Sequence, residues 1–214
     1  MPSRHCCIVD QKFDERTAHR ELRRYHRRGP ATPTRQLLTL IAPLLPSQAT
    51  LLDVGGGIGT IHHELLDRAA ARAVQVDASS AYLAVARTEA ARRGHADRVE
   101  LQHADLRAVA PSLQPADVVT LDRVVCCDPD FASLLAIAAG HARTFLAFSY
   151  PRPRWIVRLL VAFGNGWMRL RSLAFRAYVH SPPAMAAVLE RAGLHRRVVG
   201  GTWIWAVEVF ERAR

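Results

Sequence analysis

From residue 49 onward, short apolar runs alternate with stretches in which apolar residues recur at helical spacing. The apolar runs predict strands at 50–54, 73–77, 98–102, 117–121, 144–149, 196–200 and 204–211. The stretches between them predict helices at about 59–70, 80–93, 130–141 and 182–192. Alternating strands and helices are typical of a mostly parallel sheet with helices on both faces. We therefore expect an α/β fold with a doubly wound sheet of seven strands, the last two forming an antiparallel pair.

Helices without intervening strands precede this core. Residues 13–28 contain good helix formers and predict a helix that ends at Gly29-Pro30. Residues 34–45 predict a second helix, which Pro46 ends. We expect a single domain over 1–214, made of an N-terminal helical cap at 1–48, a core at 49–150, a helical insertion at 151–181, and a C-terminal helix and strand pair at 182–214.

The insertion combines apolar and basic residues. Apolar residues at positions 155, 156, 159, 160 and 163 make one helical face, and Gly164-Asn165-Gly166 predicts a hinge that divides the stretch in two. The polar side carries Arg154, Arg158, Arg169 and Arg171. Three interpretations remain open: a helical hairpin packed on the edge of the sheet, a lid over a ligand, or a membrane-surface contact through residues 152–176.

The turn after the first predicted strand carries the clearest chemical signal. Asp53, Gly55, Gly57 and Gly59 follow the spacing Asp-x-Gly-x-Gly-x-Gly between a strand and a helix. Glycines at such a turn allow a ligand to lie against the backbone, and the carboxylate before them suits a cationic ligand. Asp77 ends the second strand about twenty residues later, where a carboxylate accepts hydrogen bonds from ribose hydroxyls.

This segment resembles motif I of the class I S-adenosylmethionine (SAM)-dependent methyltransferases, which have a Rossmann-like fold. The resemblance implies SAM as the cofactor, with the glycine backbone at its methionine part and Asp53 at its ammonium group. It places Asp77 at the ribose, and Asp105 with Leu106 at the adenine. A helix N-cap is the alternative role for Asp105. The residues expected at the cofactor are Asp53, Gly55, Gly57, Gly59, Asp77, Ala78, Asp105, Leu106, Asp122 and Tyr25, the last closing over it from the N-terminal helices.

The fourth strand ends at Asp122, the position that faces the transferred methyl group in the resembling enzymes. Members that methylate nucleobase or glutamine amines have Asn-Pro-Pro-Tyr there, whereas this chain has Asp122-Arg123-Val124-Val125. Metal-dependent catechol O-methyltransferases add an Asp-Asn pair after the next strand, where this chain has Ser149-Tyr150-Pro151. We therefore expect no metal ion. Asp122 could steer the acceptor or act as a base, or form a salt bridge with a nearby arginine.

Histidine is the natural general base for an acceptor hydroxyl. His180 follows the insertion and is the best-placed candidate, with Tyr178 beside it. The alternative is a structural role for His180. The catalytic residues predicted from the sequence are accordingly His180, Asp122 and Tyr178.

Composition and charge constrain the location and the partners of the protein only a little. No apolar stretch approaches the length of a membrane span, and the N-terminus has no apolar signal region, so we expect a cytoplasmic protein. The cysteine pairs Cys6-Cys7 and Cys126-Cys127 have neither the pattern of a disulfide framework nor the usual spacing of zinc ligands. The formal charge is +10, and Lys12 is the only lysine among 29 basic residues, so the charge comes from scattered arginines.

Together these features predict metal-independent methyl transfer from SAM to a small, hydrophobic or anionic acceptor, with O-methylation favoured. The chain broadly resembles the ubiquinone/menaquinone and magnesium-protoporphyrin O-methyltransferase groups. A nucleic-acid partner is not expected, although the charge supports RNA methylation as an alternative. A non-catalytic nucleotide-binding module is a further alternative. The sequence does not indicate an oligomeric state.

Overall fold

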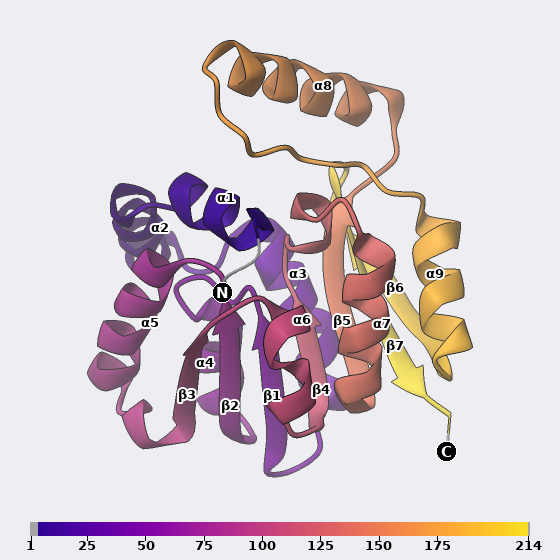
Figure 1. Cartoon of the computed structure of the whole chain (residues 1–214). Coiled ribbons are helices and arrows are strands. Elements are labelled where there is room, and N and C mark those ends of the chain that lie inside the picture. The colour runs from indigo at the N-terminus through magenta and orange to yellow at the C-terminus, as the bar shows by residue number, and fades with distance from the viewer. Residues whose placement is uncertain (1–3, 214) are drawn as a thin grey trace.

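A computed structural model describes residues 4–213. Its seven strands form one sheet in the order β3-β2-β1-β4-β5-β7-β6 (Figure 1). The first five strands run parallel, and β7 is antiparallel to both of its neighbours. The strands are β1 Ala49–Val54, β2 Ala70–Asp77, β3 Val99–His103, β4 Ala116–Leu121, β5 Ala142–Pro151, β6 Leu194–Gly201 and β7 Trp205–Arg212. The prediction of a doubly wound, seven-stranded α/β fold is confirmed.

Helices precede and cover this sheet. They are α1 Arg4–Lys12, α2 Glu15–Arg28, α3 Thr32–Ile41, α4 Thr60–Leu66, α5 Ser80–Arg93, α6 Leu106–Val109, α7 Phe131–His141, α8 Trp155–Leu170 and α9 Pro182–Arg191. Short 3-10 turns lie at Ala42–Leu44, Ala96–Arg98, Ala110–Ser112 and Val125–Cys127. The sequence did not predict α1. It is separate from α2 because Asp14 caps the second helix, accepting a hydrogen bond from the Thr17 amide at 2.9 Å.

The central strands are apolar on both faces because helices cover each face of the sheet. Leu51 of β1 packs with α3 and α4 on one side, whereas its neighbour Leu52 packs with α7 and α9 on the other. Val118 and Val119 of β4 divide between the two faces in the same way. This alternation of successive side chains explains why the strands appear in the sequence as continuous apolar runs.

The insertion differs from the predicted hinged hairpin. It forms one continuous helix, α8, followed by residues 171–181, which return to α9 without a further helix (the return segment). Gly164 and Gly166 do not break α8. Asn165 between them bonds both backbone groups of Ala177 in the return segment, at 2.8 and 2.9 Å. Figure 1 shows α8 as the outermost element, above the carboxyl ends of the strands.

Among residues 4–213, no helix is both long and apolar enough to span a bilayer.

Candidate active site

A cavity of about 440 Å³ lies at the carboxyl ends of the central strands. Its walls come from the glycine turn, from the end of β2, from the loop after β4, from the N-terminal helices and from the return segment. The volume is within the range of small-molecule sites. Of the residues predicted from the sequence, those that line it are Asp53, Gly55, Gly57, Asp77, Ala78, Asp105, Leu106 and Asp122. The parallel strands bring these positions together because their carboxyl ends share one edge of the sheet.

The glycine turn presents backbone to the cavity. Gly55 and Gly57 both adopt positive φ values, 62° and 59°. The Gly55 amide bonds the Val76 carbonyl at 2.7 Å, which fixes the turn to β2. A Cβ on Gly57 would lie 3.3 Å from the Tyr82 ring, so a side chain there would crowd the cavity wall. The turn therefore brings a bare backbone surface into contact with any ligand in the cavity.

Asp53 is fully buried beneath this turn, and both of its oxygens are held. Thr120 of β4 donates to Oδ1 at 2.7 Å, and His62 Nδ1 lies 3.0 Å from Oδ2. Thr120 is also the residue paired with Asp53 across the two strands. The carboxylate is thus fixed before a ligand arrives, which suits it to orienting a cationic group.

Gly59 does not line the cavity, unlike the other two predicted glycines. It lies at the start of α4 with φ 85°. A Cβ there would lie 2.6 Å from His62 Nε2 and 2.8 Å from His63 Nε2. The third glycine of the motif therefore makes room for two buried imidazoles and does not itself contact the cavity.

Asp77 ends β2 at the cavity wall. Its Oδ2 accepts from the Gly57 amide at 2.9 Å and its Oδ1 from the Ser79 amide at 2.8 Å. Burial raises the pKa of Asp77 to about 6, although these two amides act in the opposite direction. Hydroxyl donors from a ligand would favour the charged form further, as expected of a carboxylate that holds a ribose.

Asp105 combines both roles that the sequence left open. Its side chain caps α6 by accepting from the Arg107 amide at 3.0 Å, and the residue also lines the cavity. Leu106 lies beside it and is buried in the apolar wall. Whether Asp105 meets an adenine amine stays a prediction.

Asp122 is held by donors from three different elements. Ser149 Oγ donates to Oδ1 at 2.5 Å, Thr34 Oγ1 to Oδ2 at 2.6 Å, and Arg123 Nε to Oδ2 at 3.2 Å. The arginine contact is the salt bridge that the sequence offered as an alternative. Because its lone pairs are occupied in this way, Asp122 is better suited to shaping the site than to taking a proton.

Arg123 is a cavity residue that the sequence reasoning missed. Its φ of 61° is unusual for a residue other than glycine and marks local backbone strain at the end of β4. The guanidinium bridges Asp122 and Glu21 of α2, and its Nη2 lies 2.9 Å from Glu21 Oε1. Burial raises the pKa of Glu21, but Arg123 and a hydrogen bond from Tyr82 outweigh it and lower the pKa overall. Glu21 is therefore charged, and α2 is tied to the sheet.

Phe13, at the bend between α1 and α2, closes the cavity from the N-terminal side. Its ring packs edge-on against Tyr82 of α5 and against Phe175 of the return segment, with centroids 5.8 and 5.6 Å apart. All three residues line the cavity. The N-terminal helices and the return segment thus meet at the cavity, and the lid interpretation of the insertion stays a prediction.

The vicinal thiols Cys126 and Cys127 also line the cavity, with their Sγ atoms 3.9 Å apart. The hydrogen bond with Cys127 and burial raise the pKa of Cys126 well above its usual value, so this thiol stays protonated at neutral pH. Among the described residues, no cluster of three or more His, Cys, Asp or Glu side chains is placed to hold a metal. The side chain of Cys6 lies outside the described part of the chain.

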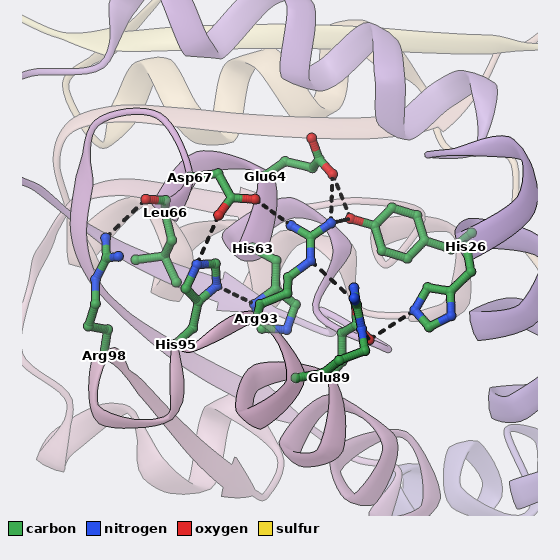
Figure 2. Close-up of polar contacts among 11 residues, drawn as sticks. His26, His63, Glu64, Leu66, Asp67, Glu89, Arg93, His95 and Arg98 are labelled. Carbon is green, nitrogen blue, oxygen red and sulfur yellow. Dashed lines mark hydrogen bonds and ion pairs between the residues drawn. The ribbon is translucent and has the colours of Figure 1, made fainter.

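Tyr25 does not line the cavity, contrary to its predicted place over the cofactor. Its hydroxyl donates to Glu64 at 2.5 Å and accepts from Arg93, and the Arg93 guanidinium lies over its ring. Arg93 is the centre of a polar network that joins α2, α4 and α5 (Figure 2). Tyr25 lies one helical turn beyond Glu21 on the same face of α2, and there its hydroxyl meets Glu64 of α4 and Arg93 of α5 instead of the cavity.

The same network reaches a buried pair of histidines. His95 bonds Asp67 at 3.0 Å and His63 at 3.1 Å (Figure 2). Burial, with His62 and Arg93 nearby, lowers the pKa of His63 to about 2. His63 is therefore neutral, and the network stabilises the packing behind the glycine turn.

His180 and Tyr178 also lie outside the cavity lining. His180 Nε2 lies 2.9 Å from the Asp128 carbonyl and 3.1 Å from the Val125 carbonyl, so it donates to the backbone. Tyr178 stacks on the His180 ring, and its amide bonds the Cys126 carbonyl at 2.8 Å. These contacts give both residues a structural role in fastening the return segment.

Comparison with known proteins agrees with this geometry. A family model described as "methyltransferase domain" matches residues 51–144, which include the glycine turn and Asp122. A release factor glutamine methyltransferase from Cereibacter sphaeroides is 32% identical over 163 residues, covering 75% of this chain and 52% of that protein. The chain thus spans about half the length of this curated relative.

Solved structures show the same fold. A magnesium protoporphyrin IX methyltransferase from Synechocystis with bound S-adenosylhomocysteine superposes with a TM-score of 0.76 at 18% identity, covering 97% of this chain and 99% of that one. An O-methyltransferase family 2 protein from Planctomyces limnophilus in complex with apigenin has a TM-score of 0.67 at 22% identity, covering 93% and 62%. Residues 51–144 of the chain thus match a methyltransferase-domain family, and the chain as a whole has the fold of these methyltransferases.

Proposed function

We propose that this chain transfers the methyl group of SAM to a hydroxyl oxygen of a small, largely apolar acceptor, without a metal ion. The observation that carries the proposal is the two-part character of one cavity. One part of its lining is the bare backbone of Gly57 with the carboxylate of Asp77, and another part is the aromatic wall of Phe13 and Phe175.

The polar part of the lining fits the cofactor. Asp77 would accept from the ribose hydroxyls, and the glycine backbone would contact the methionine part, with Asp53 orienting its ammonium group. Leu106 and Ala78 supply apolar contacts for the adenine. When bound, SAM supplies a methyl group on a positively charged sulfur, which is already a good leaving group.

The aromatic part of the lining favours an uncharged molecule over an anionic one. Arg107 and Arg123 line the cavity, but both are paired with acidic residues. In the part of the chain that is described, Lys12 is the one lining cation for which no ion pair is found. Lys12 is exposed at the rim, so it could meet a polar edge of the acceptor while the rest lies against the aromatic rings.

The arrangement supports catalysis by positioning. Holding two reactants in line can supply a large part of a rate enhancement. Asp122 and Glu21 both already accept hydrogen bonds within the protein, and Cys126 is protonated. An acceptor hydroxyl that ionises readily by itself, such as a phenol or an enol, needs no strong base from the protein.

The names of the similar proteins bear on the choice of acceptor. Of the two structural neighbours above, one is named for magnesium protoporphyrin IX and the other is in complex with apigenin, and both of these molecules are large ring systems. This likeness supports, at the level of fold, the resemblance to the magnesium-protoporphyrin group. The Cereibacter relative is named for a glutamine acceptor. We do not propose that acceptor, because Asp122-Arg123-Val124-Val125 stands where amine-methylating members carry Asn-Pro-Pro-Tyr.

The test is a transfer assay with methyl-labelled SAM. The full chain is incubated with a panel of phenols and quinols, with short fatty acids as anionic acceptors, and with total RNA. We expect label in the phenol or quinol products, and a Phe13→Ala variant should raise the KM for the acceptor. Label confined to RNA would support the alternative enzyme. Saturable SAM binding without transfer to any acceptor would support a non-catalytic module.

A further inference from the structure

Helix α8 turns its apolar face to solvent. In this helix, which the structure describes throughout, Val157 alone is buried. The exposed fractions of the large apolar side chains are high: Trp155 73%, Leu159 61%, Leu160 56%, Phe163 75%, Trp167 52% and Leu170 78%. At about 100° per residue these positions fall within one continuous arc of the helix. Such an arc normally faces a core, so on the outermost element of the fold it indicates a binding surface.

The charges around this face have one sign. Six arginines lie between positions 152 and 176, and no Asp or Glu occurs from residue 131 to residue 189. Arg154 stacks on Trp203, and Arg171 stacks on Trp167, at 5.1 and 4.8 Å from the ring centroids. Arg158 and Arg169 lie at the flank of the apolar arc, on the side of Trp155. The surface is therefore apolar at its centre and purely basic at its border.

A second apolar element lies at the same end of the sheet. The turn between β6 and β7 exposes Trp203 and Ile204. The Arg152 amide donates to the Ile204 carbonyl at 2.7 Å, which fixes this turn beside the chain that enters α8. Helix α8 and the β6–β7 turn thus each expose a tryptophan with an arginine lying over its ring.

We propose that α8 docks on an anionic phospholipid surface, with its apolar arc at the acyl boundary and its arginines at the phosphates. A tryptophan-bearing amphipathic helix with a basic border has the composition of an interfacial helix. A second copy of this chain is a poor occupant, because a symmetric contact would place the same arginines against one another with no acidic partner. The docking does not depend on methyl transfer, since it rests on the outer face of α8 and on the β6–β7 turn, which lie outside the cavity lining.

Docking in this way would place the cavity near the bilayer. The return segment runs beneath α8 and contributes Phe175 and Ala177 to the cavity wall (Figure 1). Asn165 of α8 holds Ala177 through two hydrogen bonds. An apolar acceptor dissolved in the membrane would then have a short route to the site.

The experiment is flotation of the full chain with two kinds of vesicle. One contains phosphatidylcholine alone, and the other contains two-thirds phosphatidylcholine and one-third phosphatidylglycerol. We expect flotation with the anionic vesicles, weakened by added salt. Leu159→Ser with Phe163→Ser should reduce the partition coefficient by about tenfold or more, because both side chains lose their apolar contact. These positions are exposed, so the variant should fold, and a thermal melt checks that it does.

A charge-matched pair of variants separates the local surface from the net charge of +10. Arg158→Gln with Arg169→Gln should weaken binding by about tenfold or more. Arg68→Gln with Arg72→Gln removes the same charge from exposed residues at the opposite end of the sheet and should change binding little. Equal losses in the two pairs, or no flotation of the wild type, would overturn the proposal. So would a self-association in lipid-free solution that Phe163→Ser abolishes, because α8 would then be a contact between copies.

Discussion

His62 Nδ1 lies 3.0 Å from Asp53 Oδ2, and both side chains are buried beneath the glycine turn. The contact fixes the carboxylate that precedes the first glycine of the motif. His62→Leu removes one of its two side-chain partners, the other being Thr120. Leaving a buried carboxylate half satisfied should cost roughly 2–3 kcal/mol of unfolding free energy. We also expect weaker SAM binding, measured by calorimetry beside a urea titration.

His62→Gln is the matched variant, because its side-chain amide can still donate a hydrogen bond. It should recover part of both losses. A His62→Leu protein that binds SAM as tightly as the wild type would show that Asp53 needs no positioning by this histidine.

The protonation of Asp77 predicts a pH dependence of both protein stability and SAM affinity. Burial raises the folded pKa of Asp77 to about 6 from an ordinary 3.8. Between these values the folded state holds the proton and the unfolded state does not, so this group's contribution to stability falls as pH rises from about 4 to about 6. Ribose hydroxyls need the charged form as acceptor. SAM affinity should therefore fall by about tenfold per pH unit below about 6.

Calorimetry with SAM at several pH values from 5 to 8 measures this effect. The Asp77→Asn variant should bind SAM weakly, because its side chain lacks the negative charge. Its affinity should not change with pH, because an amide does not titrate in this range. A wild-type affinity that stays flat across the range would contradict the role of Asp77.

Gly59 and Gly94 allow a steric effect to be separated from a backbone effect. Both have positive φ, 85° and 71°, but a Cβ on Gly59 would meet two imidazoles, whereas no described atom lies within 4 Å of one on Gly94. Gly94→Ala should cost only the conformational penalty, roughly 1–2 kcal/mol. Gly59→Ala should cost about 1–3 kcal/mol more through overpacking. Equal losses in chemical denaturation would contradict the packing role assigned to Gly59.

The pair Glu21 and Arg123 links α2 to the cavity and can be tested by a double-mutant cycle. Glu21→Gln and Arg123→Gln should each destabilise the protein, and the double variant less than their sum. The guanidinium side chain is 37% exposed, so solvent screening keeps the coupling to about 1 kcal/mol. Additive losses in thermal or urea unfolding would show that the two charges do not support each other.

The contrast between Asp77 and Arg123 shows what the sequence can predict. Asp53 and Asp77 end apolar runs, and the parallel fold itself carries such positions to one edge of the sheet. Glu21 and Arg123 meet across 102 positions of the chain, and no local pattern marks such a pair. His180 lies at the end of the insertion in sequence, which suggests a catalytic role, but its ring bonds backbone carbonyls of the loop between β4 and α7. The sequence predicts which residues follow the end of a strand. It does not predict which side chain each of them bonds, because those contacts depend on tertiary packing.

The hinge predicted at Gly164-Asn165-Gly166 failed for a related reason. Glycine lowers helix stability by roughly 1 kcal/mol relative to alanine, which is too little to end a long helix by itself. The hydrogen bonds between Asn165 and Ala177 hold the helix against the return segment at this point. The apolar pattern of α8 was also read correctly as one helical face, but the sequence alone did not show that this face points outward.

The most direct test of the central claim is calorimetric titration of the full chain with SAM, beside Asp77→Ala and the control Asp97→Ala. Asp97 is exposed in the turn before β3, away from the cavity lining. We predict saturable binding of one SAM per chain, weakened about tenfold or more in Asp77→Ala by the loss of charge-assisted hydrogen bonds, and unchanged in Asp97→Ala. Absence of saturable binding, or equal affinity in all three proteins, would contradict the assignment of this cavity to the cofactor.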